Sequence, residues 1–180
     1  MMKQLFIRTM NLWSQPHFTA FYVAAASAAL LAVAYTSQYV FGLDPCILCY
    51  YQRIPYFVVI ALGLAAFAVA PKSEKLALYL IFLCGIGFLI DAGIAGFHVG
   101  VEHGAWKGLE ACGNAAMPAN ATPEEMRAFI MSRDIVRCDV PAFTLFGISM
   151  AGYNFLIALG LMLDTFALLW WRVKKCPVKS

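Results

Sequence analysis

The chain has 180 residues, of which 62% are hydrophobic and 13% are charged, with a net charge of +3. Soluble domains have about 45–50% apolar and about 25% charged residues, so this composition excludes a soluble domain and a disordered or collagen-like chain. Six cysteines are also too few, in a chain of this length, for a small secreted protein held together by disulfides. The composition therefore predicts an integral membrane protein, and the six cysteines need an explanation.

Four long apolar segments follow one another along the chain, and their only charged residues are Asp91 and Asp164. Each segment is close to the about 20 residues, range about 17–25, with which a helix crosses the hydrocarbon core. A helix also satisfies its own backbone hydrogen bonds there. We predict a single-domain, all-α integral membrane protein, a bundle of four transmembrane helices. The predicted helices span residues 18–40, 54–70, 76–98 and 144–168.

Lysine and arginine gather at the N-terminus, in the connection at residues 71–75 and in the C-terminal tail. Taken together, the connections at residues 41–53 and 99–143 hold seven acidic and five basic residues. The positive-inside rule therefore predicts that both termini are cytoplasmic and that these two connections are periplasmic loops. The net positive charge then reflects topology and does not indicate nucleic-acid binding. The first apolar segment exceeds the about 7–15 residues of a signal-peptide core, so we expect a retained anchor.

The second periplasmic loop, residues 99–143, is long enough to carry structure of its own. Thr122 is a helix N-cap, Pro123 suits the first helical position, and acidic residues follow. Met126, Phe129 and Ile130 then recur at helical spacing, which predicts a short amphipathic helix. Such a helix would lie on the membrane surface or face a partner, or it would only pack the loop down.

The predicted topology divides the cysteines into groups. Four lie on the external side, where disulfides persist: Cys46, Cys49, Cys112 and Cys138. Cys84 lies in the middle of an apolar segment, and we expect it to be a small core residue. Cys176 lies in the cytoplasmic tail, where a reduced thiol is expected.

Redox chemistry is indicated by Cys46 and Cys49, which are separated by two residues. Thiolates in such motifs have lowered pKa values, which suits a disulfide that is made and broken repeatedly. If Asp44 caps a helical turn there, Cys46 lies near the positive end of the helix dipole. Arg53, four residues after Cys49, would share its face and stabilise a thiolate or a reduced anionic acceptor. Pro55 opposes a continuous helix at this point.

A zinc site is the alternative use of four external cysteines. Cys112 and Cys138 lack the short spacing of structural zinc ligands, so we predict no metal. A thioredoxin-like domain is also excluded, because its cysteine pair lies in a βαβ unit and this sequence contains no βαβ pattern.

The pattern resembles the DsbB family, the bacterial disulfide bond formation protein B. The resemblance rests on Cys46-x-Leu48-Cys49-x-x-Gln52-Arg53 after a first membrane helix, on the second external cysteine pair, and on the segment at residues 145–151. The family is a thiol oxidoreductase of the bacterial inner membrane. The resemblance implies that a Cys112–Cys138 disulfide oxidises a periplasmic thioredoxin-like dithiol protein of the DsbA type. The electrons would then pass to Cys46 and Cys49 and finally to a membrane quinone, ubiquinone or menaquinone.

The resemblance also implies a role for each residue. Cys112 would form the mixed disulfide with the partner, and Cys138 and Cys46 would exchange between the loops. Cys49 would be the thiolate that contacts the quinone, with Arg53 beside it. His103, in the Glu102-His103 pair after the third helix, would be a second quinone ligand.

Two other functions are weighed against this one. The vitamin K epoxide reductase family also couples thiols to quinones, but its loop cysteines precede the membrane pair, whereas here Cys46 and Cys49 come first. A four-span scaffold stapled by disulfides would leave Cys46 and Cys49 inert. Asp91, His98 and Glu102 share one helical face that leads outward. That face is either a polar lining near the quinone or, as we favour, an interhelical polar network.

Overall fold

The computed structural model describes residues 2–109, 112, 122–124, 127 and 136–175. Its helices and strands follow in chain order: α1 (Met2–Trp13), α2 (Pro16–Tyr39), α3 (Ile47–Val69), α4 (Glu74–Glu102), β1 (Thr144–Leu145), β2 (Ile148–Ser149) and α6 (Met150–Lys175).

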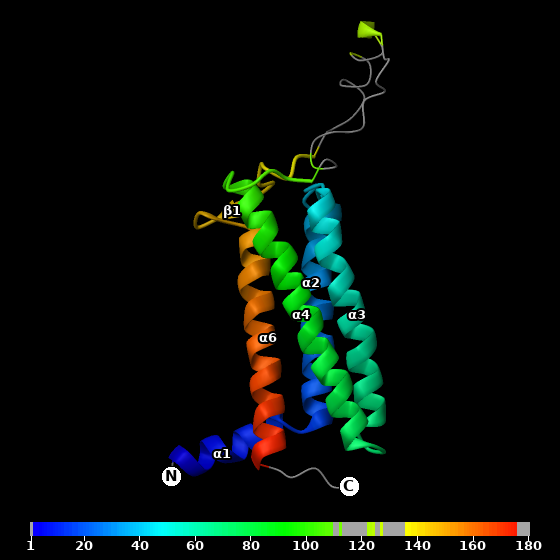
Figure 1. Ribbon diagram of the computed structural model, residues 1–180, viewed down its shortest axis with the longest axis vertical. Helices are drawn as coiled ribbons and strands as arrows, with labels where there is room; N and C mark the ends of the chain where they lie inside the picture. Colours follow the sequence, from blue (N-terminus) through cyan, green and yellow to red (C-terminus); the bar gives the residue numbers. More distant parts are fainter. Residues whose placement is uncertain (1, 110–111, 113–121, 125–126, 128–135, 176–180) are drawn as a thin grey trace.

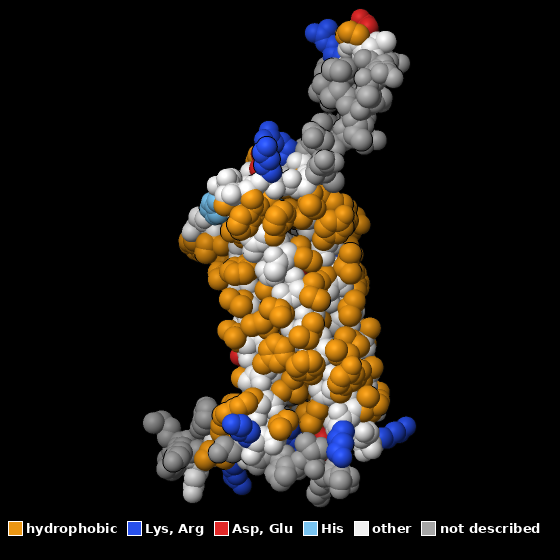
Figure 2. Space-filling view, viewed as in Figure 1, with side chains coloured by type: hydrophobic (Ala, Val, Ile, Leu, Met, Phe, Trp, Pro, Cys, Tyr) orange, Lys and Arg blue, Asp and Glu red, His pale blue; other side chains and the backbone are white. Residues whose placement is uncertain are grey.

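Four of these helices form an up-and-down bundle, in which α4 packs against α3 and α6, and α3 packs against α2 (Figure 1). Each of the four is long and apolar enough to cross a membrane, which confirms the predicted four-helix membrane fold. Figure 2 shows hydrophobic side chains covering the middle of the bundle, with lysine and arginine at its two ends. Helix α2 begins and α6 ends at the same end of the bundle (Figure 1). The connections that carry the external cysteines therefore meet at the other end.

Helices α3 and α6 begin six or more residues away from the positions that the sequence pattern indicates, whereas α2 and α4 begin within two residues of them. Helix α3 begins at Ile47 and not at residue 54, because Cys46 caps it: the Cys46 sulfur accepts a hydrogen bond from the Cys49 amide. The helix continues through Pro55, which costs one backbone hydrogen bond. Helix α6 begins at Met150 and not at residue 144, because the preceding residues form the β1–β2 hairpin. The hairpin turn has positive φ angles at both Phe146 and Gly147, as a two-residue turn of type I′ requires.

The sequence pattern does not indicate helix α1, since its residues are predicted only to form a cytoplasmic N-terminus. It lies across the end of the bundle at which α2 begins (Figure 1). Two hydrogen bonds hold it there: the Thr19 hydroxyl donates to the Trp13 carbonyl oxygen at 2.8 Å, and the Trp171 indole donates to Asn11 Oδ1 at 2.8 Å.

Small residues let α2 and α3 approach closely at the centre of the bundle. A methyl group at Gly63 would lie 3.0 Å from Ala24 Cβ and 3.1 Å from the Ala20 carbonyl oxygen. Close packing of this kind is a main source of helix association in lipid, where burial of apolar surface between helices gains little. The close approach of α2 and α3 therefore depends on the absence of a side chain at Gly63.

Asp91 is fully buried within α4. Asn154 Nδ2 donates to Asp91 Oδ2 at 3.0 Å, and the Tyr56 hydroxyl donates to Asn154 Oδ1 at 2.6 Å. These contacts join α3, α4 and α6, so they favour the interhelical network over a polar lining for Asp91. The predicted amphipathic helix of the second loop cannot be assessed, because Met126, Phe129 and Ile130 lie outside the described residues.

The α2–α3 contact makes a prediction about stability. Replacing Gly63 by leucine forces the two helices apart, so we expect Gly63→Leu to cost about 1–3 kcal/mol, as overpacking does. Gly93 is the matched control, because a methyl group there meets no atom within 4 Å. Thermal unfolding in detergent measures the difference. Equal unfolding temperatures for Gly63→Leu and Gly93→Leu would contradict the proposed contact.

Candidate active site

Cys46 and Cys49 lie at the first turn of α3, at the end of the bundle where the two connections meet. Their sulfurs are 3.1 Å apart, within hydrogen-bonding distance for thiols, and both cysteines are free. Cys46 is buried, whereas Cys49 is partly exposed. The sequence motif thus places two reduced sulfurs against each other at the edge of the apolar region.

The surroundings of Cys46 favour its ionised form. The hydrogen bond with the Cys49 thiol, aided by His98, holds the pKa of Cys46 well below its ordinary value, although burial opposes this. The Cys49 amide, 3.4 Å away, also donates to the Cys46 sulfur at the start of the helix. These contacts therefore favour the Cys46 thiolate, which becomes protonated as the pH falls through this lowered pKa.

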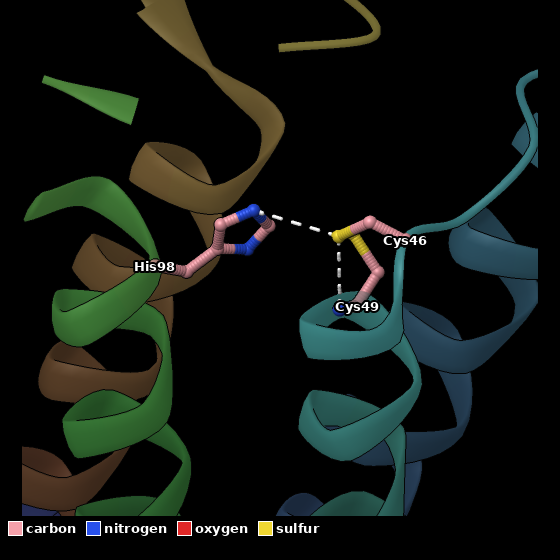
Figure 3. Close-up of side chains that lie close together, drawn as sticks. All are labelled: Cys46, Cys49 and His98. Carbon is pink, nitrogen blue, oxygen red and sulfur yellow. Dashed lines mark hydrogen bonds between the residues drawn. The ribbon is translucent and has the colours of Figure 1, made fainter. Parts of the chain in front are cut away.

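His98 reaches Cys46 from the opposite helix, α4. Figure 3 shows its ring pointing across to the Cys46 sulfur, with Nε2 3.5 Å from Sγ. The other ring nitrogen, Nδ1, lies 3.3 Å from Gln52 Nε2. Glu102 Oε1 lies 3.8 Å from His98 Nε2, and the Ser149 hydroxyl donates to Glu102 Oε2. His98 is 3% exposed, so this contact with the thiol pair is shielded from water.

The sequence pattern does not indicate His98 as a site residue. It places His98 on a polar face shared with Asp91 and Glu102, for which a packing role is favoured. The signal was present, because this face leads to the end of the bundle that carries the cysteines. What the sequence lacks is the contact itself, which joins residues 52 positions apart.

Arg53 lies one helical turn after Cys49 and is buried. Its Nη1 donates to Gln38 Oε1 at 2.8 Å, which ties α3 to α2. The guanidinium also lies over two aromatic rings, 4.7 Å from the centroid of Tyr35 and 5.1 Å from that of Tyr50. These contacts hold a positive charge in place beside the first turn of α3.

His103 follows α4 as its C-cap, and its side chain is exposed. Its amide donates to the Val99 carbonyl oxygen at 3.1 Å, which ends the helix. Of the two histidines in this region, His98 faces the thiol pair and His103 lies beyond it, near water.

Cys112 and Cys138 form a disulfide, with their Cα atoms 5.2 Å apart. Cys138 is 1% exposed and belongs to the same buried cluster as Cys46, Leu48 and Val101, and Cys112 packs against that cluster. The structure therefore brings all four external cysteines together, although the two pairs are far apart in the sequence.

Metal binding can be tested against this geometry. The ligand atoms of Cys46, Cys49 and His98 lie within 4.8 Å of one another, which is close enough for one ion. Hydrogen bonds account for the same distances, so we assign no metal to this cluster. A zinc site of four cysteines cannot form while Cys112 and Cys138 are joined in a disulfide.

Four apolar helices with a thiol pair and a disulfide at one end define a multi-pass membrane protein equipped for thiol–disulfide exchange. Comparison with known families agrees with this class. The family described as "Disulfide bond formation protein DsbB" matches residues 16–168, and the chain belongs to the DsbB family. Family membership implies a disulfide oxidoreductase with a role in disulfide bond formation, and it confirms the resemblance seen in the sequence.

Two of the relatives cover most of the chain. Disulfide bond formation protein B of Methylococcus capsulatus is 32% identical over 155 residues, 82% of this chain and 90% of the relative. Disulfide bond formation protein B 2 of Pseudomonas savastanoi is 29% identical over 159 residues, 83% of this chain and 86% of the relative. For disulfide bond formation protein B of Acinetobacter baumannii the match spans only about half of each protein, 49% and 52%, at 33% identity. No solved structure matches the chain.

The shared cluster predicts a specific disulfide. In the double variant Cys49→Ser, Cys112→Ser, the remaining external thiols are Cys46 and Cys138, which lie in one buried cluster. We expect them to join in an interloop disulfide, detected by peptide mapping without reduction. Cys84, which is fully buried within α4, should remain a free thiol in the same digest. Free Cys46 and Cys138 under oxidising conditions would contradict this arrangement.

Proposed function

We propose that the chain reoxidises a periplasmic, thioredoxin-like dithiol protein of the DsbA type and passes the electrons to a membrane quinone. The observation that carries this proposal is the position of Cys138 and Cys46 in one buried cluster, although each belongs to a different cysteine pair. Two redox pairs held in one cluster are positioned to exchange electrons by thiol–disulfide chemistry, which needs direct contact between sulfurs.

Exposure supports the order of the exchange. Cys112 is partly exposed, whereas Cys138 is buried, so a thiolate from a water-soluble partner reaches Cys112 more easily. Its attack on Cys112 forms a mixed disulfide and releases Cys138. Cys138 then attacks Cys46 of a Cys46–Cys49 disulfide, and Cys49 leaves as the thiolate. The partner's second thiolate then attacks the partner's sulfur in the mixed disulfide, which releases the oxidised partner and leaves Cys112 as a thiolate. The partner's two electrons then reside on the Cys49 and Cys112 thiolates.

The residues around Cys49 fit a quinone. The side chains of Tyr50, Tyr51 and Ile54 are 46%, 41% and 56% exposed and offer an apolar, aromatic surface beside the first turn of α3. Arg53 supplies a fixed positive charge one turn further along. A bound quinone would supply an acceptor for two electrons and two protons.

We assign quinone binding to Cys49, Arg53 and His103. Arg53 is held by Gln38 and by aromatic rings, so it would orient an electronegative oxygen without moving. The exposed side chain of His103 lies at the same end of the bundle and would supply a second contact. Ubiquinone and menaquinone both satisfy this chemistry.

We place the protein in the bacterial inner membrane with both termini in the cytoplasm. The end of the bundle that holds the termini also carries Lys72 and Arg172, as the positive-inside rule requires of a cytoplasmic face. The cysteine pairs at the opposite end then face the oxidising periplasm. The scaffold alternative leaves Cys46 and Cys49 inert, and the buried contact between Cys46 and His98 does not favour it.

The first functional prediction concerns Cys49. The purified protein in detergent should reduce ubiquinone when it is given a reduced thioredoxin-like dithiol protein, followed by the change in quinone absorbance. Cys49→Ser should abolish turnover, because the pair can no longer form its disulfide. Cys84→Ser is the matched control, since Cys84 lies in the bundle core away from both pairs. Turnover by Cys49→Ser at the wild-type rate would contradict the proposed mechanism.

The second functional prediction concerns Arg53. Losing its charge removes one contact that we assign to quinone, so Arg53→Ala should raise the KM for quinone by about tenfold or more, the equivalent of one charge-assisted hydrogen bond. Arg8→Ala is the control, because Arg8 is exposed on α1 at the other end of the bundle. An unchanged KM in Arg53→Ala would remove Arg53 from the quinone site.

A further inference from the structure

The proposed electron path gives no role to His98. His98 is 3% exposed and lies 3.5 Å from the Cys46 sulfur, yet no step described so far uses it. A titratable side chain that touches a reacting sulfur is positioned to exchange a proton with it.

The structure holds the state in which such a proton matters. Cys112 and Cys138 are joined, while Cys46 and Cys49 are free, so the electrons reside on the pair at the membrane edge. To reach this state, Cys46 must leave a disulfide as a thiolate. A negative charge then forms on a buried sulfur, where it needs a partner.

The charged groups around His98 can stabilise its protonated form. Within the described part of the chain, the titratable groups in contact with His98 are Cys46 from the start of α3 and Glu102 from α4. Glu102 Oε1 lies 3.8 Å from Nε2, and Ser149 at the start of α6 holds the other carboxylate oxygen. A carboxylate in this position stabilises the protonated imidazole and orients its ring. Arg53 is turned toward Gln38 on α2.

Gln52 permits both protonation states of the ring. Its side-chain amide faces Nδ1 at 3.3 Å. With Nε2 of Gln52 toward the ring, the amide donates to Nδ1 and the neutral imidazole carries its proton on Nε2, toward Cys46. When both ring nitrogens are protonated, rotation of the amide presents its oxygen to Nδ1–H, and this pairing stays in place after Nε2 gives its proton to Cys46. Nδ1 therefore keeps a hydrogen-bond partner through the proton exchange.

We propose that His98 is a catalytic acid–base residue that exchanges a proton with the Cys46 sulfur, and that Glu102, held by Ser149, is a positioning residue for His98. This inference rests on the proposed function for the reaction in which it acts. As the Cys112 thiolate attacks Cys138 of an interloop disulfide, the Cys112–Cys138 bond forms and the Cys46–Cys138 bond breaks. The electron pair stays on Cys46, and the imidazolium stabilises it and can give it the Nε2 proton. Reoxidation of the pair, with a quinone as acceptor, returns the proton to Nε2.

The test measures Cys46 alone and needs neither quinone nor partner. The full-length protein, with Cys46 and Cys49 reduced, is treated with iodoacetamide from about pH 3 to about pH 9, which brackets both the lowered pKa of Cys46 and the ordinary pKa values of histidine and cysteine. Tandem mass spectrometry then gives the rate of alkylation at Cys46 for each pH. Only the thiolate reacts, so the rate reports the ionised fraction.

We expect His98→Ala to move the midpoint of this profile upward by about one pH unit or more, which slows alkylation about tenfold below the midpoint. His98→Gln should behave alike, because glutamine forms hydrogen bonds but cannot carry the proton. Glu102→Gln keeps a hydrogen-bond acceptor for Ser149 and should give a smaller shift in the same direction. His17→Ala is the matched control, because His17 lies at the other end of the bundle, and it should leave the profile unchanged.

An unshifted profile in a His98 variant that keeps the Cys112–Cys138 disulfide and the wild-type unfolding temperature overturns the role of His98. A shift in the His98 variants without one in Glu102→Gln overturns the role of Glu102. If His98→Ala does not fold, His98→Gln and Glu102→Gln decide the question. The failure of quinone reduction in the wild-type protein would instead count against the proposed function, and the alkylation profile does not depend on that reaction.

Discussion

The buried cluster of Cys46, Leu48, Val101 and Cys138 is the contact on which the site depends. Thiol–disulfide exchange requires direct contact between sulfur atoms. The loop disulfide can therefore react with the cysteine pair of α3 only if the fold holds both pairs at the same position along the bundle axis. Helix α3 supplies the first pair because its cap is Cys46 itself, and α4 supplies Val101 because it extends to Glu102. The apolar neighbours also exclude water, which strengthens each electrostatic contact with the sulfurs.

The membrane explains why two pairs are needed in one protein. A quinone dissolves in lipid and a dithiol protein dissolves in water, so neither reaches a cysteine pair placed for the other. The four helices carry Cys49 to the edge of the apolar band, whereas the loop disulfide lies outside the helices. Both pairs face the same side, so the protons released by a dithiol and taken up by a quinone need not cross the membrane.

Most of the architecture could be predicted because its signals are local. Long apolar runs and the two-residue spacing of Cys46 and Cys49 need no knowledge of distant contacts. The features that were missed depend on tertiary structure: α1 is held by Trp171 near the other end of the chain, and the hairpin turn uses a positive φ at Phe146, a residue type that seldom adopts it. His98 was missed as a site residue for the same reason, because only the packing of α4 on α3 shows what it faces.

The central claim is that the pair at the membrane edge gives its electrons to a quinone while the loop disulfide remains intact. One equivalent of ubiquinone is added to protein in which Cys46 and Cys49 are the only reduced external cysteines. The reaction is stopped with acid, and free thiols are alkylated before peptide mapping without reduction. The account predicts two disulfides, Cys46–Cys49 and Cys112–Cys138. Alkylated Cys46 and Cys49 in the presence of quinone would contradict it.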